Sequence, residues 1–269
     1  MSKHLRPPKV SLRRVWRTIV PAPLLKYGQP AAIALAFRQI KTALARGEPA
    51  PMPGPLIVSG LIAGTKGISR AARLTIDGMR AAGHAPIGHD LYTLFSSSTD
   101  QVGRLPTSRP GGAWLLHMNA PEAISAMSRI TPADWLGRYR IAYWAYELAR
   151  VPARWVSASS VFHEIWAPSR FVADALVASG VTKPVRVMPH PVSLTPPPIA
   201  SHSSDDEFIV LAMGDLKSSA TRKNLIGAIR IYKHAFPQQV PATQLVLKVQ
   251  SEDAHPRFRE AALAVAGGR

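Results

Sequence analysis

Apolar residues recur at two spacings along the middle of the chain. Short apolar runs, typical of buried strands, lie at residues 56–58, 113–117, 141–145, 162–167 and 185–188. Apolar positions that recur every three or four residues predict helices at 68–82 and 170–179. Strands that alternate with helices in this way indicate an α/β domain with a parallel, doubly wound sheet.

A change of composition divides the chain after this domain. Residues 189–207 are rich in Pro, Ser and acidic side chains, and a second unit then opens with strands at 208–213 and 244–249 around a helix at 225–236. Two strands are too few for a complete doubly wound sheet, so we expect an incomplete domain in a fragment or truncated gene product. The predicted organisation is a basic tail with a Pro-rich linker at 1–55, a Rossmann-like domain at 56–190, an interdomain linker at 191–207, and an incomplete domain at 208–269.

Positive charge is concentrated near the N-terminus. The chain has 33 Lys and Arg against 16 Asp and Glu, a net charge of +17, which favours an acidic partner or reflects compositional drift alone. Residues 1–50 contain one anion, Glu48, and are predicted to form an appendage. A short basic helix at 11–20 containing Trp16 suits peripheral membrane contact through residues 1–20, and a solvated tail is the alternative.

Composition excludes several kinds of chemistry. The chain has no Cys, which excludes disulfides, thiolate nucleophiles and cysteine-bound metals. No apolar run approaches the roughly 20 residues that span a bilayer, and charged residues recur through Arg17 where a signal peptide would be apolar. We therefore expect a cytoplasmic protein. His163 and Glu164 are adjacent, but no further ligand stands at metal-site spacing, so no metal is expected.

A glycine-rich turn follows the first predicted strand. Gly60, Gly64 and Gly67 do not have the G-x-G-x-x-G spacing of dinucleotide-binding loops. The turn either allows a helix and a strand to pack closely or forms a backbone wall beside a ligand. In the second case Ser69 and Arg70, at the start of the next helix, could meet an anion.

Polar residues follow two later strands. His117 and Asn119 lie where the strand at 113–117 ends, and ligands of doubly wound sheets bind at such carboxyl ends. A buried, hydrogen-bonded histidine is the alternative for His117. Glu147 follows three aromatic residues, so we expect either a desolvated carboxylate with a raised pKa or the partner of a cation such as Arg150.

Two adjacent cations, Arg222 and Lys223, stand where the strand at 208–213 hands over to a helix. The positive end of the helix dipole disfavours cations there unless an anion is bound, whereas a solvated charge pair is the alternative. Lys248, at the end of the next strand, is a weaker candidate for the same anion.

Several segments resemble a known family. AYWAYELARVPARW, FHEIWAPSRFVADAL and VRVMPHPV resemble the junction between the acceptor and donor domains of family 4 glycosyltransferases, which have the GT-B fold of two Rossmann-like domains. The segment GLIAGTKGISRAARLTIDGMRAAGH resembles their first βα unit, and TRKN with its following helix resembles the start of their nucleotide-sugar domain. The resemblance covers about residues 56–260. It implies one complete Rossmann-like domain and the first part of a second.

The resemblance also implies a function. It implies a retaining, metal-independent enzyme that moves a sugar from a nucleotide-diphospho-sugar to a saccharide or lipid-linked acceptor in polysaccharide or glycolipid assembly. No cofactor is implied beyond the sugar donor. The residue roles that follow are donor-diphosphate binding by Arg222, Lys223 and Lys248, a catalytic position for His117 near the sugar, and an acceptor-side cleft bordered by Gly64, Gly67, Asn119 and Glu147.

The chain departs from the family in two places, which leaves other functions open. Lys66 replaces a small residue of the glycine loop, and the family's glutamate-rich motif would lie beyond residue 269. An inactive or regulatory GT-B fragment is therefore one alternative. A basic nucleic-acid-binding protein is another, but no nucleic-acid motif appears and much of the charge lies in the tail, so we expect no nucleic-acid partner. The sugar, nucleotide, acceptor and oligomeric state are not determined by the sequence.

Overall fold

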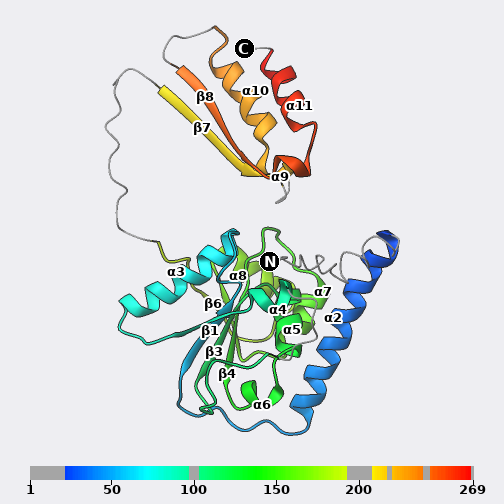
Figure 1. Ribbon diagram of the computed structural model, residues 1–269, viewed down its shortest axis with the longest axis vertical. Coiled ribbons are helices and arrows are strands. Elements are labelled where there is room, and N and C mark those ends of the chain that lie inside the picture. The colour runs from blue at the N-terminus through cyan, green and yellow to red at the C-terminus, as the bar shows by residue number, and fades with distance from the viewer. Residues whose placement is uncertain (1–21, 97–102, 193–207, 217–219, 239–242, 268–269) are drawn as a thin grey trace, which may run out of the picture. The chain divides into compact units, whose positions relative to one another are not determined.

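The computed structural model describes residues 22–96, 103–192, 208–216, 220–238 and 243–267, with residues 22–29 and 96 described through their backbone alone. The chain divides into two compact units, Met1–Thr195 and Pro196–Arg269, and Figure 1 shows the elements of each. The predicted short helix at 11–20 and most of the predicted linker at 191–207 lie outside the described residues.

The first unit is built from alternating strands and helices. Its elements are α2 (Ala22–Ala45), β1 (Leu56–Gly60), α3 (Gly67–Ala81), β2 (Ile87–Asp90), α4 (Tyr92–Ser96), β3 (Ala113–His117), α5 (Ala120–Ser128), α6 (Pro132–Trp135), β4 (Tyr139–Tyr143), α7 (Ala153–Ser159), β5 (Glu164–Ala167), α8 (Arg170–Ala178) and β6 (Val185–Val187). The six strands form one parallel sheet in the order β2-β1-β3-β4-β5-β6. The predicted α/β fold with a parallel, Rossmann-like sheet is therefore confirmed.

Helices cover both faces of this sheet. On one face α3 places Ile76 and Met79 against Val58, Leu115 and Ile141 of the central strands. On the other face α5, α7 and α8 contribute to a larger core in which Trp114, Trp144 and Phe162 are fully buried. Parallel strands need apolar cover on both faces, and the near-continuous apolar runs of β3 and β4 provide it.

Helix α8 has residues at both ends that favour starting and ending a helix. The side chain of Ser169 accepts a hydrogen bond from the backbone N–H of Val172, as an N-cap residue does. Gly180 lies just past the helix with a φ of +101°, a conformation that glycine adopts without steric cost. The helix predicted at 170–179 is therefore confirmed, and its last residue is Ala178.

The described part of the predicted tail at 1–55 is not separate from the first unit. Helix α2 packs on α5 through Ala36 and Ile40, which are buried, and through the partly buried Ile33, Phe37 and Leu44. These residues recur every three or four positions, so one stripe of the helix faces the core. Residues 30–45 therefore belong to the first unit.

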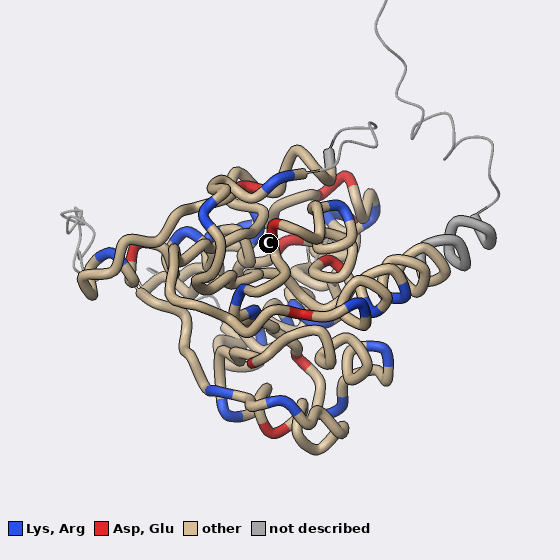
Figure 2. Tube along the Cα trace, turned by 90° about the horizontal axis from the view of Figure 1, so that it is seen from below, with Lys and Arg blue, Asp and Glu red and all other residues tan. Residues whose placement is uncertain are grey.

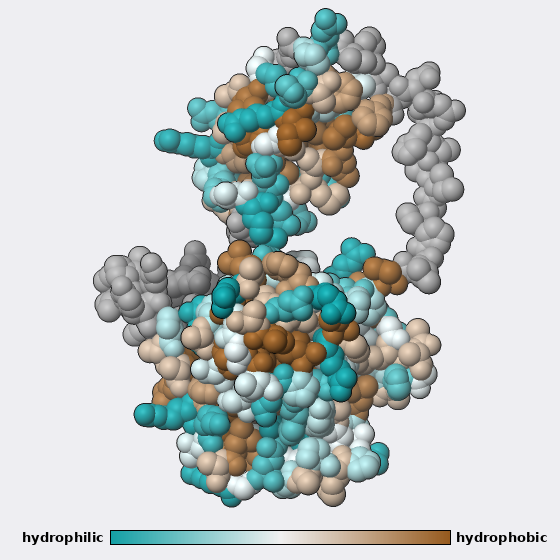
Figure 3. Space-filling view, turned by 180° about the vertical axis from the view of Figure 1, so that it is seen from behind, coloured by the Kyte–Doolittle hydropathy of each residue, from teal (hydrophilic) through white to brown (hydrophobic). Residues whose placement is uncertain are grey.

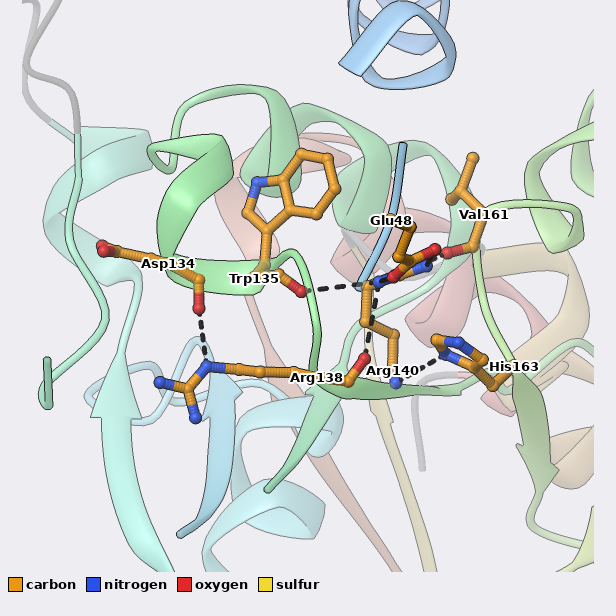
Figure 4. Close-up of polar contacts among 7 residues, drawn as sticks. All are labelled: Glu48, Asp134, Trp135, Arg138, Arg140, Val161 and His163. Atoms are coloured by element: carbon orange, nitrogen blue, oxygen red, sulfur yellow. Dashed lines mark hydrogen bonds and ion pairs between the residues drawn. The ribbon is translucent and has the colours of Figure 1, made fainter. Parts of the chain in front are cut away.

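An ion pair fixes the segment that follows α2. Both carboxylate oxygens of Glu48 accept hydrogen bonds from the guanidinium of Arg140, whose side chain is only 3% exposed. Figure 4 shows that Arg140 also donates to the backbone oxygens of Val161 and Trp135. Burial raises the pKa of the Glu48 carboxyl, but the hydrogen bond and charge of Arg140 outweigh this and hold the pKa below its usual value.

The second unit contains two parallel strands and their helices. Its elements are β7 (Phe208–Asp215), α9 (Ala220–Lys223), α10 (Leu225–Ala235), β8 (Thr243–Gln250), the 3₁₀ turn η1 (Glu252–Ala254) and α11 (Phe258–Ala266). Side chains of the two strands alternate between the faces of the sheet. Leu245, Leu247 and Val249 line a cavity of about 680 Å³ together with α10 and α11.

The opposite face of this small sheet is uncovered among the described residues. Ile209, Leu211 and Met213 of β7 are each about half exposed, and Val246 of β8 is also exposed. Figure 3 shows hydrophobic side chains on the surface of this unit. Parallel sheets normally have both faces buried, so the exposure of these apolar side chains is unusual for a parallel sheet.

None of the described helices combines the length and apolar character that crossing a membrane requires.

Candidate functional site

The strand order of the first unit reverses between β1 and β3. From β1 the chain passes through α3 to β2, at one edge of the sheet. From β3 onward the later connections lead in the opposite direction, through β4 and β5 to β6 at the other edge. Ligands of doubly wound sheets bind at the carboxyl ends of the strands at this switch point. Strands β1 and β3 are labelled in Figure 1. Their last residues, Gly60 and His117, are paired directly across the switch point.

Close packing at the switch point requires Gly60. A Cβ atom added to Gly60 would lie 3.2 Å from Cβ of Ala72 in α3 and 3.3 Å from the carbonyl oxygen of His117. Both distances are shorter than ordinary contacts, so a side chain here would push α3 away from the sheet. The prediction that glycine lets helix and strand approach is thus confirmed at Gly60.

Two side chains hold the glycine loop of residues 60–67 in place. Arg73 of α3 donates hydrogen bonds to the carbonyl oxygens of Ile62 and Gly64. Asp90, the last residue of β2, accepts hydrogen bonds from the backbone N–H groups of Ala63 and Tyr92, at 3.2 and 3.1 Å. The loop is therefore fixed from both sides by hydrogen bonds within the first unit.

The start of α3 presents unused hydrogen-bond donors. The backbone N–H groups of residues 65–68 have no acceptor within the described part of the chain. The Oγ atom of Ser69, in a residue that is 1% exposed, has no hydrogen-bond partner among the described residues either. It faces the loop, since a Cβ atom on Gly64 would lie 2.5 Å from it. Donors grouped at a helix N-terminus favour an anion, with Lys66 and Arg70 exposed beside them.

His117 lies behind this loop and is buried. Its Nε2 atom is 3.2 Å from the Thr75 hydroxyl of α3, and its ring stacks on Tyr143. Its Nδ1 atom has no hydrogen-bond partner among the described residues. The same is true of two other buried polar side-chain atoms, Ser69 Oγ and Trp144 Nε1. Burial and the nearby His190 lower the pKa of His117 to about 3, so the imidazole is neutral near pH 7.

His117 thus matches the alternative reading of a buried, hydrogen-bonded histidine. Its ring is 1% exposed, so a sugar could contact it only if the residues above it moved. In the observed conformation it joins α3 to β4 through Thr75 and Tyr143. A direct catalytic role for His117 remains a prediction.

Tyr143 connects the switch point to the segment after β6. Its hydroxyl donates to the carbonyl oxygen of Met188 at 2.8 Å and lies 3.0 Å from Nδ1 of His190. The single phenolic proton is used on Met188, so Nδ1 of His190 is the donor in the second contact. Burial raises the pKa of the Tyr143 hydroxyl and lowers that of His190.

The two other acceptor-side candidates have different surroundings. Oδ1 of Asn119 accepts a hydrogen bond from the backbone N–H of Ala145 at 2.9 Å, which joins the ends of β3 and β4. Glu147 is exposed, so the prediction of a desolvated carboxylate is wrong: the chain leaves β4 before residue 147 and carries it into solvent. The guanidinium of Arg150 donates to the carbonyl oxygen of Ala178. Gly64 is partly buried and Gly67 exposed at the loop.

In the second unit, Arg222 and Lys223 lie near the carboxyl end of β7. Both are exposed in the short helix α9, and Asn224, with a φ of +48°, separates them from α10. The stem of Lys223 packs on Gly214 of β7, where an added Cβ would lie 3.1 Å from it. The pair therefore precedes the first turn of α10. This agrees with the helix predicted at 225–236, which begins after Lys223.

Lys248 does not project toward the helices of its unit. It pairs with Met213 in the register of the sheet, and its exposed side chain alternates with the cavity-lining Leu247 and Val249. It lies on the uncovered face of the sheet with Val246. Its assignment to the donor site remains a prediction.

Sequence reasoning missed three residues that shape the site: Arg73, Asp90 and Tyr143. Strand β2 has a single strongly apolar residue, Ile87, so no periodicity indicated the strand that Asp90 ends. Arg73 looked like one of many exposed arginines, and Tyr143 like a core aromatic. The available signal was position, because Arg73 lies in the helix that follows the glycine loop, and Asp90 and Tyr143 are the last residues of β2 and β4.

Comparison with models of known protein families and with curated proteins finds no match. Within the described ranges, no group of three or more His, Asp and Glu residues is arranged to hold a metal ion.

Proposed function

We propose that this protein is a glycosyltransferase of the GT-B type that moves a sugar from a nucleotide-diphospho-sugar to a saccharide or lipid-linked acceptor. The observation that carries the proposal lies at the switch point of a doubly wound sheet: among the described residues, neither the Ser69 hydroxyl nor the N–H groups of residues 65–68 have a hydrogen-bond partner. Such donors suit phosphate oxygens, and both the substrate and the product of this reaction have them. The resemblance of residues 56–260 to family 4 enzymes gives the reaction class.

The proposed reaction breaks the bond between the anomeric carbon and the diphosphate. The acceptor hydroxyl oxygen forms the new bond to that carbon on the same face of the sugar, and its proton passes to the departing diphosphate. Negative charge collects on the diphosphate as it leaves. Arg222 and Lys223 would stabilise this charge by direct ion pairing, as a metal ion does in other transferases.

Residues of the first unit would then position the other reactants. The neutral His117 would hold α3 and β4 in place below the loop instead of exchanging protons at pH 7. The Oδ1 atom of Asn119 is used by Ala145, whereas its amide nitrogen has no partner among the described residues and would donate to the acceptor. The proposal includes a cytoplasmic location, where nucleotide-sugars are made.

Calorimetry with UDP-, GDP- and ADP-sugars in the presence of EDTA tests the proposal. We expect one nucleotide to bind without metal. The double variant Arg222→Ala and Lys223→Ala should weaken its binding about 1,000-fold, because two hydrogen bonds to charged groups contribute about 2 kcal/mol each. Arg230→Ala, which removes an exposed cation from α10 in the same unit, is the matched control.

Two outcomes would contradict the proposal. If no nucleotide-sugar binds, the reaction class is wrong. If the double variant binds as tightly as the wild-type protein, the assignment of the donor diphosphate to Arg222 and Lys223 is wrong.

A further inference from the structure

The first 47 residues contain no Asp or Glu. They contain ten cations: Lys3, Arg6, Lys9, Arg13, Arg14, Arg17, Lys26, Arg38, Lys41 and Arg46. A segment with charge of one sign attracts a surface of the opposite sign, unless anions elsewhere in the fold lie beside it. The described part of α2 shows whether they do.

Helix α2 presents its cations away from the core. Ala36 and Ile40 are buried against the domain, whereas Arg38, Lys41 and Arg46 are exposed. No ion pair among the described residues involves any of these three cations. Figure 2 shows α2 at the outside of the first unit, with basic residues along it.

The nearest anion in the sequence is already used. Glu48, three residues after the end of α2, has both carboxylate oxygens on the buried guanidinium of Arg140 (Figure 4). Its charge neutralises Arg140 and therefore does not offset the cations of α2. No described carboxylate is therefore paired with the exposed cations of α2.

The outer face also has an apolar component. Leu35 is 56% exposed, one turn before Arg38, and the exposed positions around it are Ala31, Ala32 and Ala34. Along an α-helix the positions 31, 34 or 35, 38, 41 or 42 and 45 follow one face. Small apolar side chains and cations on one face are suited to lying at the headgroup level of a bilayer.

We propose that the outer face of α2 docks on a membrane surface rich in anionic lipid. Lys and Arg near such a surface are attracted to its headgroups, and Leu35 with the neighbouring alanines can enter the interfacial region without exposing charge to hydrocarbon. Nucleic acid would satisfy the cations equally well but offers no partner for the exposed Leu35. Docking of α2 is independent of glycosyl transfer, so either proposal can fail alone.

Sedimentation of the full chain with vesicles tests this docking. We expect binding to vesicles of phosphatidylglycerol and phosphatidylcholine at 0.1 M salt, little binding to phosphatidylcholine alone, and loss of binding at 1 M salt. Each charge removed should reduce the partition coefficient about five-fold, so the double variant Arg38→Gln and Lys41→Gln should reduce it about 25-fold. Arg109→Gln with Arg170→Gln removes two exposed cations from other parts of the unit and should keep wild-type binding.

Three results would overturn the proposal. The first is equal binding to anionic and neutral vesicles. The second is binding to anionic vesicles that the Arg38 and Lys41 substitutions leave unchanged, which would assign it to other cations. The third is tight binding to a 20-base-pair DNA duplex together with no binding to vesicles, which would make nucleic acid the partner. Circular dichroism of each variant separates lost binding from lost folding.

Discussion

The imidazole ring of His117 lies flat against the ring of Tyr143, with centroids 4.1 Å apart and an angle of 11° between the planes. Tyr143 is in turn hydrogen-bonded to Met188 and in contact with His190. Two neighbouring strands and the segment after β6 therefore meet behind the glycine loop. No carboxylate among the described residues interacts with His117, so a proton on its ring would create an unpaired charge in an apolar interior.

The first prediction concerns stability against pH. His117 has a pKa of about 3 in the folded protein, against an ordinary value of 6.5. Below pH 6.5 the unfolded chain takes up a proton that the folded protein does not, so stability is lost as pH falls from 6.5 toward 3. Each pH unit costs about 1.4 kcal/mol. Between pH 6.5 and 5, His117→Gln should therefore lose about 2 kcal/mol less than the wild-type protein in urea unfolding.

Tryptophan fluorescence is the suitable readout, because all six Trp residues precede residue 195 and report on the first unit alone. His84→Gln, which replaces an exposed histidine, is the control and should follow the wild-type curve. Equal pH slopes for His117→Gln and the wild-type protein would show that His117 is not the buried neutral group described.

The second prediction is that Ser69→Ala stabilises the protein. The Ser69 hydroxyl is buried and has no partner in the part of the chain that the structure describes, and removing an unsatisfied polar group relieves about 1 kcal/mol. Ser159→Ala is the matched comparison. Its hydroxyl is also buried but donates to the carbonyl oxygen of Val156 at 2.6 Å, so its loss should destabilise by about 1 kcal/mol. Opposite signs are expected in urea unfolding, and a destabilising Ser69→Ala would mean that the hydroxyl has a partner.

The third prediction separates a buried ion pair from a surface pair. Glu48→Gln should lower the free energy of unfolding by about 3 kcal/mol, since it leaves the buried guanidinium of Arg140 without its counter-charge. Asp77→Asn removes the partner of Arg80 from an exposed pair in α3 and should cost less than about 0.5 kcal/mol. Similar losses in the two variants would mean that Arg140 is solvated after Glu48 is removed.

The fourth prediction uses the alternation of β7 and β8. Leu211→Lys places a charge on the uncovered face of the small sheet, and it should reduce binding of a hydrophobic dye without unfolding the second unit. Leu245→Lys places the same charge in the cavity between β8 and the helices, where it should unfold that unit. Hydrogen exchange of the β7 and β8 amides distinguishes the two, and equal protection in both variants would contradict the assigned faces.

Much of the first unit could be predicted because its strongest elements are locally consistent. β3 and α8 have the apolar spacing, caps and glycines that their structures need, so sequence and fold agree. Helix α2 was not predicted, because its local sequence does not favour a helix. Gly28 and Pro30 are poor helix residues, and they hid the apolar stripe of Ile33, Ala36 and Ile40 that tertiary packing stabilises.

The candidate site was only partly predictable. The glycine loop and the strand end at His117 were located from the sequence, because both follow directly from the rule for parallel sheets. Burial of the His117 ring, exposure of Glu147 and the support from Asp90 depend on packing between distant segments. Those contacts leave no periodic signal in a single sequence.

The ion pair between Glu48 and Arg140 has a further consequence for how the chain folds. Its partners are 92 residues apart, and α5, on which α2 packs, begins only at Ala120. Contacts of such long range form late, because the intervening loop must close first. During synthesis the residues of α2 leave the ribosome well before those of α5. Until α5 has been made, the basic and apolar side chains of α2 are both exposed on the nascent chain.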